Sequence, residues 1–240
     1  MSPDRNRILE AAILGLCLLA GLIALGFFIS HSLTQLRMLE RSVEVKGLSE
    51  REVPADIAIW PITFREPGND LAELYQSVQQ KNDLVVKFLE DNGFTTDEMT
   101  ISAPAVVDKQ AREYDNADAN ARFRFTATST ITVYSKKVDA VRKTMIRLAD
   151  LGKQGIAISS EGYNTQFVYS QLNQIKPAMI EEATRNARET ADKFARDSDS
   201  TLGKIKRASQ GQFSIEDRDS STPHIKKVRV VSTVQYYLSD

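Results

Sequence analysis

The pattern of apolar and polar positions separates one long uncharged segment from a polar body. The segment from Ala11 to Ile29 (AAILGLCLLAGLIALGFFI) contains no charged residue. As a helix rising about 1.5 Å per residue it spans roughly 28 Å, close to the thickness of a bilayer's hydrocarbon layer. A helix also satisfies its own backbone hydrogen bonds, as the membrane interior requires. We therefore predict a transmembrane signal-anchor over residues 11–29.

Charged residues near the apolar segment bear on its orientation. Arg5 and Arg7 precede it, and Arg37 and Arg41 follow it, so the charge contrast between the two sides is small. Positive residues near the ends of a span set its orientation, and the short leading tail favours a cytoplasmic N-terminus. We expect a single-pass protein of a bacterial inner membrane, with its C-terminal domain in the periplasm.

Two other interpretations of the apolar segment stay open. A cleaved signal peptide has an apolar region of about 7–15 residues that ends at small residues, whereas Phe27 and Phe28 stand at that place here. A buried helix of a soluble protein is the second alternative. Cys17 follows Leu16, which is too large for a lipoprotein site, and as the sole cysteine it permits no internal disulfide.

The body is divided by alternation, which is typical of strands, and by spacings of three and four, which are typical of amphipathic helices. We expect residues 1–10 as a cytoplasmic tail, residues 30–41 as a stalk and residues 42–240 as one periplasmic domain. The predicted strands are Ser42–Lys46, Val53–Arg65, Met99–Val107, Ala121–Ser135, Ile156–Tyr163, Lys204–Gln212 and Lys226–Leu238. The predicted helices are Asp70–Asn92, Val138–Leu151 and Gln171–Asp197.

The connections between these elements are predicted from turn residues and polarity. Gly93 and Gly152 should end the first two helices, and Leu202-Gly203 should close the third. The other predicted connections are a turn at Gly47–Arg51, a hairpin loop at Lys109–Asn120 and a mobile loop at Phe213–Pro223. Strands and helices mix without strict alternation, so the fold class is α+β, with antiparallel or mixed sheets packed against long amphipathic helices.

The third helix carries one narrow stripe of small side chains. Ala183, Ala187, Ala191 and Ala195 follow one another at intervals of four residues, so they lie on one face. Such a face permits close approach of another helix or a sheet. Good helix propensity alone would explain alanine, but it explains the regular spacing less well.

This stripe and its continuation resemble the SIMPL-domain family, the YggE-like envelope proteins of bacteria. The similarity covers roughly Ser42 to Leu238, nearly the whole body, and the long apolar segment is a departure, because many members carry a cleaved signal. The matching residues are Ala187-Arg188, Ala191, Lys193, Ala195 and Leu202-Gly203-Lys204-Ile205, with Val43-x-Val45-x-Gly47 and Val53-Pro54-Ala55-Asp56-x-Ala58 near the start.

The resemblance implies an α+β fold, assembly into ring-like or channel-like oligomers, and a link to envelope and oxidative-stress tolerance without an established enzymatic activity. The matching residues are implied to be structural rather than catalytic. Gly47 and Gly203 would serve turns, Pro54 and Asp56 the start of a strand, and the alanines packing.

Composition offers little chemistry beyond this. The formal net charge is −1, which gives no general electrostatic reason to expect nucleic acid as a partner. The two histidines, His31 and His224, are far apart in sequence, and the calcium-like run Asp115–Asp118 lacks the glycine and glutamate of an EF-hand loop. No phosphate-binding loop, nucleophile elbow or triad is recognisable. We expect no catalytic residues, metal site or cofactor.

Two functional hypotheses remain. The first is a non-enzymatic, membrane-anchored envelope protein that forms homo-oligomers through a SIMPL-like domain and contributes to stress tolerance. The second is a periplasmic module that binds a ligand or partner in the cleft between sheet and helices. Trp60, with Phe64, is either a core residue or an interface anchor, and we favour the core.

Overall fold

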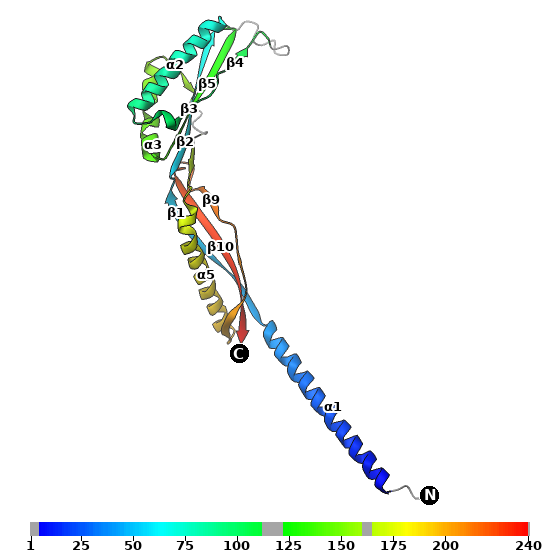
Figure 1. Ribbon diagram of the computed structural model, residues 1–240. Coiled ribbons are helices and arrows are strands. Elements are labelled where there is room, and N and C mark those ends of the chain that lie inside the picture. Colours follow the sequence, from blue (N-terminus) through cyan, green and yellow to red (C-terminus); the bar gives the residue numbers. More distant parts are fainter. Residues whose placement is uncertain (1–4, 112–121, 160–164, 240) are drawn as a thin grey trace. The chain divides into compact units, whose positions relative to one another are not determined.

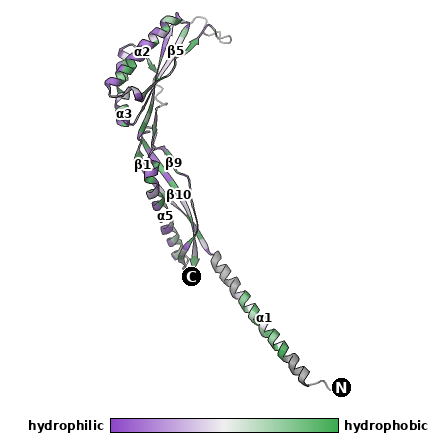
Figure 2. Ribbon diagram, viewed as in Figure 1, coloured by the Kyte–Doolittle hydropathy of each residue, from purple (hydrophilic) through white to green (hydrophobic). Residues whose placement is uncertain are grey.

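A long N-terminal helix is continuous through the predicted anchor and stalk. The computed structural model describes residues 5–111, 122–159 and 165–239, with only the backbone for residues 5–12 and 31–40. Helix α1 spans Arg5–Glu40 (Figure 1). Its stretch Ile13–Ser30 has a mean hydropathy of 2.6 and is long and apolar enough to cross a membrane, and none of it is buried against the rest of the protein. Figure 2 shows this stretch as the hydrophobic part of α1.

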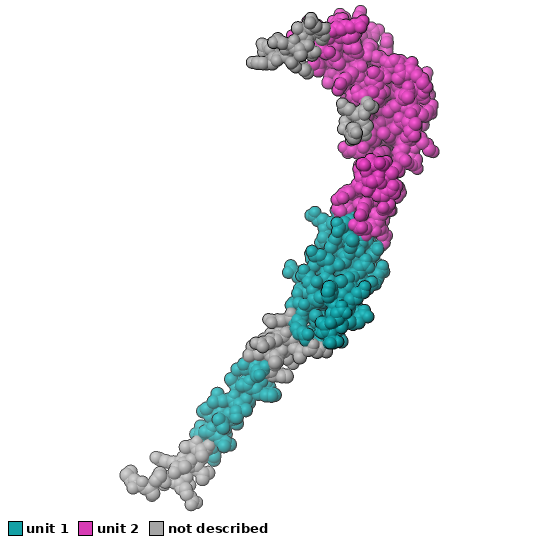
Figure 3. Space-filling model, turned by 180° about the vertical axis from the view of Figure 1, so that it is seen from behind, with its two compact units in different colours: residues 1–49, 177–213, 229–240 teal, residues 50–176, 214–228 magenta. Residues whose placement is uncertain are grey.

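The chain forms two compact units (Figure 3). Unit 1 comprises Met1–Ser49, Pro177–Phe213 and Arg229–Asp240, and unit 2 comprises Glu50–Lys176 and Ser214–Val228. Each unit therefore combines segments that are distant in the sequence. The division into tail, anchor, stalk and one domain stays a prediction.

Unit 1 pairs a sheet with one long helix. Strands β1 (Ser42–Pro54), β10 (Ile225–Ser239) and β8 (Thr201–Gln210) follow one another in that order, and helix α5 spans Leu172–Asp197. Strands β10 and β8 are antiparallel. Alternate residues of β1 and β10 are buried, as a sheet with one covered face requires. One cluster of its core consists of Val45, Ala187, Ala191, Val234 and Tyr236, and Met179, Ala183, Ala195 and Val230 are buried as well.

Unit 2 contains a second sheet with the order β3-β5-β2-β6. Its central pair, β2 (Ile57–Gly68) and β5 (Phe125–Ser135), is antiparallel, with Trp60 opposite Val133. The shorter strands are β3 (Met99–Ile101), β4 (Ala105–Asp108), β6 (Ile158–Ser159) and β7 (Gln166–Val168). The helices are α2 (Leu71–Asp91), η1 (Thr96–Glu98), α3 (Val138–Ile146) and α4 (Ala149–Lys153). A fourth strand of the other sheet, β9 (Ser214–Asp217), pairs with β10.

The predicted α+β class is confirmed, and so is the first amphipathic helix. Asp70 Oδ1 accepts hydrogen bonds from the backbone N–H groups of Ala72 and Glu73, at 2.8 and 3.0 Å, at the start of α2. At its end Gly93 adopts a φ of 88°, and Phe94 N–H donates to the Leu89 carbonyl. Both ends therefore have the caps that the sequence predicts.

The turn predicted at Gly47–Arg51 is wrong, because β1 continues through it. Val45, Gly47 and Ser49 are buried in alternation, so Gly47 occupies an inward position of a strand. The strand predicted at Val53–Arg65 is instead divided between the end of β1 and the start of β2. The predicted end of the first strand is therefore wrong, because Gly47 lies within β1 and does not end it.

Three further elements differ from their predicted extents. The strand Met99–Val107 is divided into β3 and β4, because Pro104, just before β4, has no N–H to donate. The helix Val138–Leu151 is divided into α3 and α4, and Gly152 lies inside α4. The glycine with a positive φ, 81°, is Gly155. Of the predicted strand Ile156–Tyr163, β6 covers two residues, and residues 160–163 lie outside the described part.

The last corrections concern the C-terminal third. Helix α5 ends with Asp199 at φ 51° and with a bond of 2.8 Å from Ser200 N–H to the Ala195 carbonyl, so Leu202-Gly203 does not close it. Leu202 and Gly203 lie in β8 instead. The predicted loop Phe213–Pro223 contains β9. Most of the predicted loop Lys109–Asn120, with Asp115–Asp118, lies outside the described residues.

Candidate functional site

Gly47 of β1 and the alanine stripe of α5 form what we call the packing seam. Figure 1 shows α5 lying along the sheet that contains β1. Ala183, Ala187, Ala191 and Ala195 are each at most 1% exposed. A Cβ placed on Gly47 would lie 1.8 Å from the Ala183 carbonyl oxygen and 2.5 Å from the Ala187 nitrogen. Only glycine fits there, because backbone meets backbone. Close packing between β1 and α5 therefore accounts for these residues, and we assign no ligand to any of them.

Polar contacts beside the seam fix how β1 meets its neighbours. Ser49 Oγ donates to Glu182 Oε2 at 2.9 Å, and Asn186 Nδ2 donates to the Leu48 carbonyl at 2.8 Å. Both bonds join β1 to α5, one from the inward side chain of Ser49 and one to the backbone of Leu48. They add polar contacts to the apolar packing between β1 and α5.

The remaining family-pattern residues also have structural contacts. Pro54 ends β1, and Asp56 precedes β2 and accepts hydrogen bonds from Ser170 N–H and Ser170 Oγ, both at 2.8 Å. A Cβ on Gly203 would lie 2.9 Å from the Tyr237 carbonyl oxygen, and Leu202 packs against the core of unit 1. Gly203 therefore permits close approach within the sheet, and the turn that the family pattern implied there is absent from β8.

Strand β8 has one open edge among the described strands, because it pairs with β10 and with no other. Nearly all of its ten residues are exposed, including the basic residues Lys204, Lys206 and Arg207. Ile205 is 50% exposed. Gly211 N–H donates to the Val231 carbonyl of β10 at 2.8 Å. Because backbone groups of a strand point alternately to its two sides, the N–H groups of Gln210 and Ala208 face the open edge.

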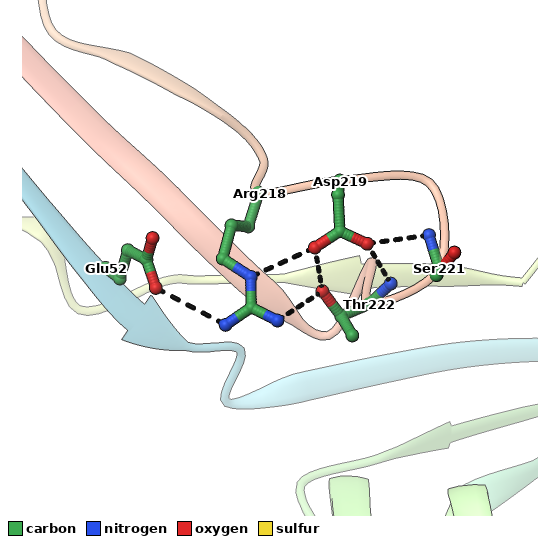
Figure 4. A network of polar contacts seen from close by, with 5 residues as sticks. All are labelled: Glu52, Arg218, Asp219, Ser221 and Thr222. Atoms are coloured by element: carbon green, nitrogen blue, oxygen red, sulfur yellow. Dashed lines mark hydrogen bonds and ion pairs between the residues drawn. The ribbon is translucent and has the colours of Figure 1, made fainter.

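A polar network fixes the segment that follows β9 (Figure 4). The guanidinium of Arg218 contacts Glu52 Oε2 at 3.4 Å and Asp219 Oδ2 at 3.0 Å, and donates to Thr222 Oγ1 at 2.9 Å. Asp219 Oδ1 accepts from the N–H groups of Ser221 and Thr222, both at 2.8 Å. The Thr222 hydroxyl and the Arg218 side chain lower the pKa of Asp219. These side chains form hydrogen bonds and ion pairs with one another, and the network therefore stabilises the turn at residues 218–222.

The histidines do not form a site. His224 is half-buried, with its ring 6.1 Å from that of Phe167 in an edge-to-face arrangement. Burial, with the nearby charge of Arg142, lowers the pKa of His224. The side chain of His31 lies outside the described residues. Over the part of the chain that the structure describes, no three His, Cys, Asp or Glu side chains are grouped as a metal would require.

The Glu98 carboxylate of unit 2 accepts hydrogen bonds from three residues. Burial alone would raise its pKa, but hydrogen bonds from Ser135 Oγ at 2.6 Å, Thr95 N–H at 3.0 Å and Lys137 Nζ at 3.0 Å lower the pKa to about 2. Every one of these donors favours the ionised form. The carboxylate joins η1 to the end of β5 and the start of α3, which is a structural task.

Unit 2 also contains a cavity of about 510 Å³ that sequence reasoning did not locate. Its walls come from β2, β6 and the segment of α3 and α4, and they include Trp60, which is 2% exposed. Trp60 is thus a core residue, as predicted. The sequence analysis expects a ligand cleft between sheet and helices in its second hypothesis, but it names no lining residue, and it predicts Gly152 only as a helix end.

A comparison with known protein families identifies the family to which these structural residues belong. A family model described as "SIMPL: Protein of unknown function (DUF541)" matches residues 43–236. This range contains every family-pattern residue discussed above and begins just after α1. No curated protein matches the chain.

Proposed function

Since the chain belongs to the SIMPL family, we propose that it is a non-enzymatic, membrane-anchored protein of the cell envelope that self-assembles through its SIMPL domain. In this proposal α1 crosses the inner membrane, the domain lies in the periplasm, and the assembly contributes to envelope or oxidative stress tolerance. Family membership supports an envelope-associated module. Self-assembly, stress tolerance and the periplasmic location are the proposed part.

The observation that carries self-assembly is the open edge of β8. An exposed strand of ten residues is a template for pairing with another chain. Natural proteins protect such edges with lysine, and Lys204 and Lys206 could serve that purpose alone. If the edge of β8 pairs with a second copy of this chain, the particle in solution has the mass of several protomers. If the lysines only protect the edge, it has the mass of one protomer.

Light scattering on the full chain, purified in detergent and corrected for bound detergent, tests this proposal. We expect one discrete species of several protomers. Replacing Ala208 by proline removes an N–H that faces the open edge while leaving the bonds to β10 in place. Ala208→Pro should therefore lower the mass, whereas Ala208→Thr, which keeps the N–H, should not. A monomer for the unmodified chain would contradict self-assembly, and an assembly unaffected by Ala208→Pro would exclude β8 as its contact.

The proposed role without enzymatic chemistry is tested by complementation of a deletion strain under envelope or oxidative stress. Replacing His31 and His224 together by alanine should leave complementation intact, because neither is assigned any chemistry. Exporting the domain without residues 1–29 should weaken it. A reproducible turnover by the purified chain that one polar substitution abolishes would contradict this part of the proposal.

A further inference from the structure

The cavity of unit 2 has walls of one chemical character. It is lined by apolar side chains of three segments, among them Trp60, Met145, Leu148, Ile156 and Ile158. Ser159 and Thr165 contribute the only hydroxyl groups of the described lining, and none of those lining residues carries a formal charge. Ligand sites in proteins are mostly apolar with a few polar groups, and their volumes are roughly 300–1,000 Å³. The cavity of about 510 Å³ lies within this range.

Gly152 lies on the rim of the cavity. It lies inside α4 with no positive φ, so the backbone does not require glycine. A glycine inside a helix is about 1 kcal/mol less favourable than alanine. A Cβ built on Gly152 meets no atom within 4 Å, so packing within the chain does not require glycine either. Gly152 is exposed, so it leaves the solvent-facing rim of the cavity free of a side chain.

We propose that this cavity binds an uncharged, largely hydrocarbon small molecule. The described lining residues offer no counter-charge for a carboxylate or phosphate, and leaving such a charge unpaired in an apolar site is costly. The apolar walls favour hydrocarbon, and the two hydroxyl groups at Ser159 and Thr165 allow one polar substituent. The inference is independent of self-assembly, because every lining residue belongs to unit 2 and β8 does not contribute.

The chain carries its own reporter for this site. Trp60 is the only tryptophan in the sequence and lies in the cavity wall. A bromine atom quenches tryptophan fluorescence only at short range, so bromobenzene in the cavity should quench Trp60. The experiment uses the full chain in phospholipid nanodiscs and compares bromobenzene with para-bromobenzoate, which has the same ring and a negative charge. We expect saturable quenching by bromobenzene and none by para-bromobenzoate.

Variants that fill the cavity distinguish binding there from partition into the bilayer. Ala149 and Gly152 both line the cavity and lie three residues apart on one face of α4. The double variant A149F/G152F should lose the saturable quenching. The matched control A72F/Q76F adds the same side chains on an exposed face of α2 and should keep it. Ala157→Phe, from another wall, is a second filling variant should the first fold poorly.

Three outcomes would overturn the proposal. Quenching that rises linearly and equally in the unmodified chain and in A149F/G152F would show that no site exists. Equal saturable quenching by para-bromobenzoate would contradict the assignment to an uncharged ligand. Quenching of Trp60 by nanodisc lipids with brominated acyl chains, without added ligand, would assign the cavity to a lipid chain instead. Bromobenzene should also raise the melting temperature of the unmodified chain and not that of the filled variant.

Discussion

At the scale of single residues, the glycines of this chain have different physical roles. A Cβ on Gly47 would overlap the backbone of α5, whereas a Cβ on Gly152 would meet open space. Gly93 and Gly155 have positive φ values of 88° and 81° and end helices. The same residue type therefore permits close packing at one position, leaves space at a second and ends helices at others.

Gly47 and Gly152 form a matched pair of alanine substitutions. Gly47→Ala should lower the free energy of unfolding by about 3 kcal/mol, because α5 must move away from β1. Gly152→Ala should leave stability unchanged or raise it by up to about 1 kcal/mol, because it improves helix propensity without a clash. Chemical denaturation of both variants measures the difference. Equal effects would contradict the packing seam.

The alanine stripe predicts a second difference on α5. Ala191 is fully buried, and Ala191→Leu should overpack the seam at a loss of about 1–3 kcal/mol. Arg188 is exposed on another face, so Arg188→Leu should change stability much less. Thermal unfolding of the two variants checks this. If both melted like the unmodified chain, the stripe would be no packing surface.

Glu98 predicts a pH dependence. Its native pKa of about 2 lies below its ordinary value of 4.5, so the unfolded state binds more protons between these values. The stabilisation is present above the ordinary pKa and is lost as the pH falls from about 5 to 2, roughly 2–3 kcal/mol in all. Glu98→Gln should destabilise the protein at pH 7 and flatten this loss, as denaturation at stepped pH values would show. An unchanged slope would contradict the assignment.

At the scale of elements, the sequence predicts types better than boundaries. The alternation of β5 and β10 and the caps of α2 are local, so the sequence alone predicts them. Gly47 and Gly203 were misread because their role depends on α5 and on Tyr237, which are distant in the sequence. The cavity is harder still, because it depends on the packing of β2 against α3 and α4. Gly152 alone could not reveal it.

The element α1 predicts attachment to the membrane. Ile13–Ser30 can span a bilayer, and we expect the full chain to stay in the membrane fraction after a carbonate wash with its N-terminus intact. Alkaline phosphatase fused after Asp240 should be active, and a reporter that works only in the cytoplasm should be silent. A soluble form beginning near Ser32 would show instead that the segment is a cleaved signal.

At the scale of the whole molecule, the chain combines a helix that is long and apolar enough to cross a membrane with a match to the SIMPL family. The family match covers residues 43–236 and α1 precedes it, so the proposed anchoring and the proposed assembly would use separate parts of the chain. Each part can therefore be tested by itself, as the carbonate wash and the Ala208 variants do. The central claim is that the chain assembles while it is anchored.

Counting photobleaching steps tests this claim most directly. The full chain, with one fluorophore fused to its C-terminus, is expressed at a low level and observed as single spots in membrane vesicles. The account predicts several bleaching steps per spot, with a distribution that has one preferred number and shifts downward for Ala208→Pro but not for Ala208→Thr. Spots that bleach in a single step, at the density expected for independent molecules, would contradict it.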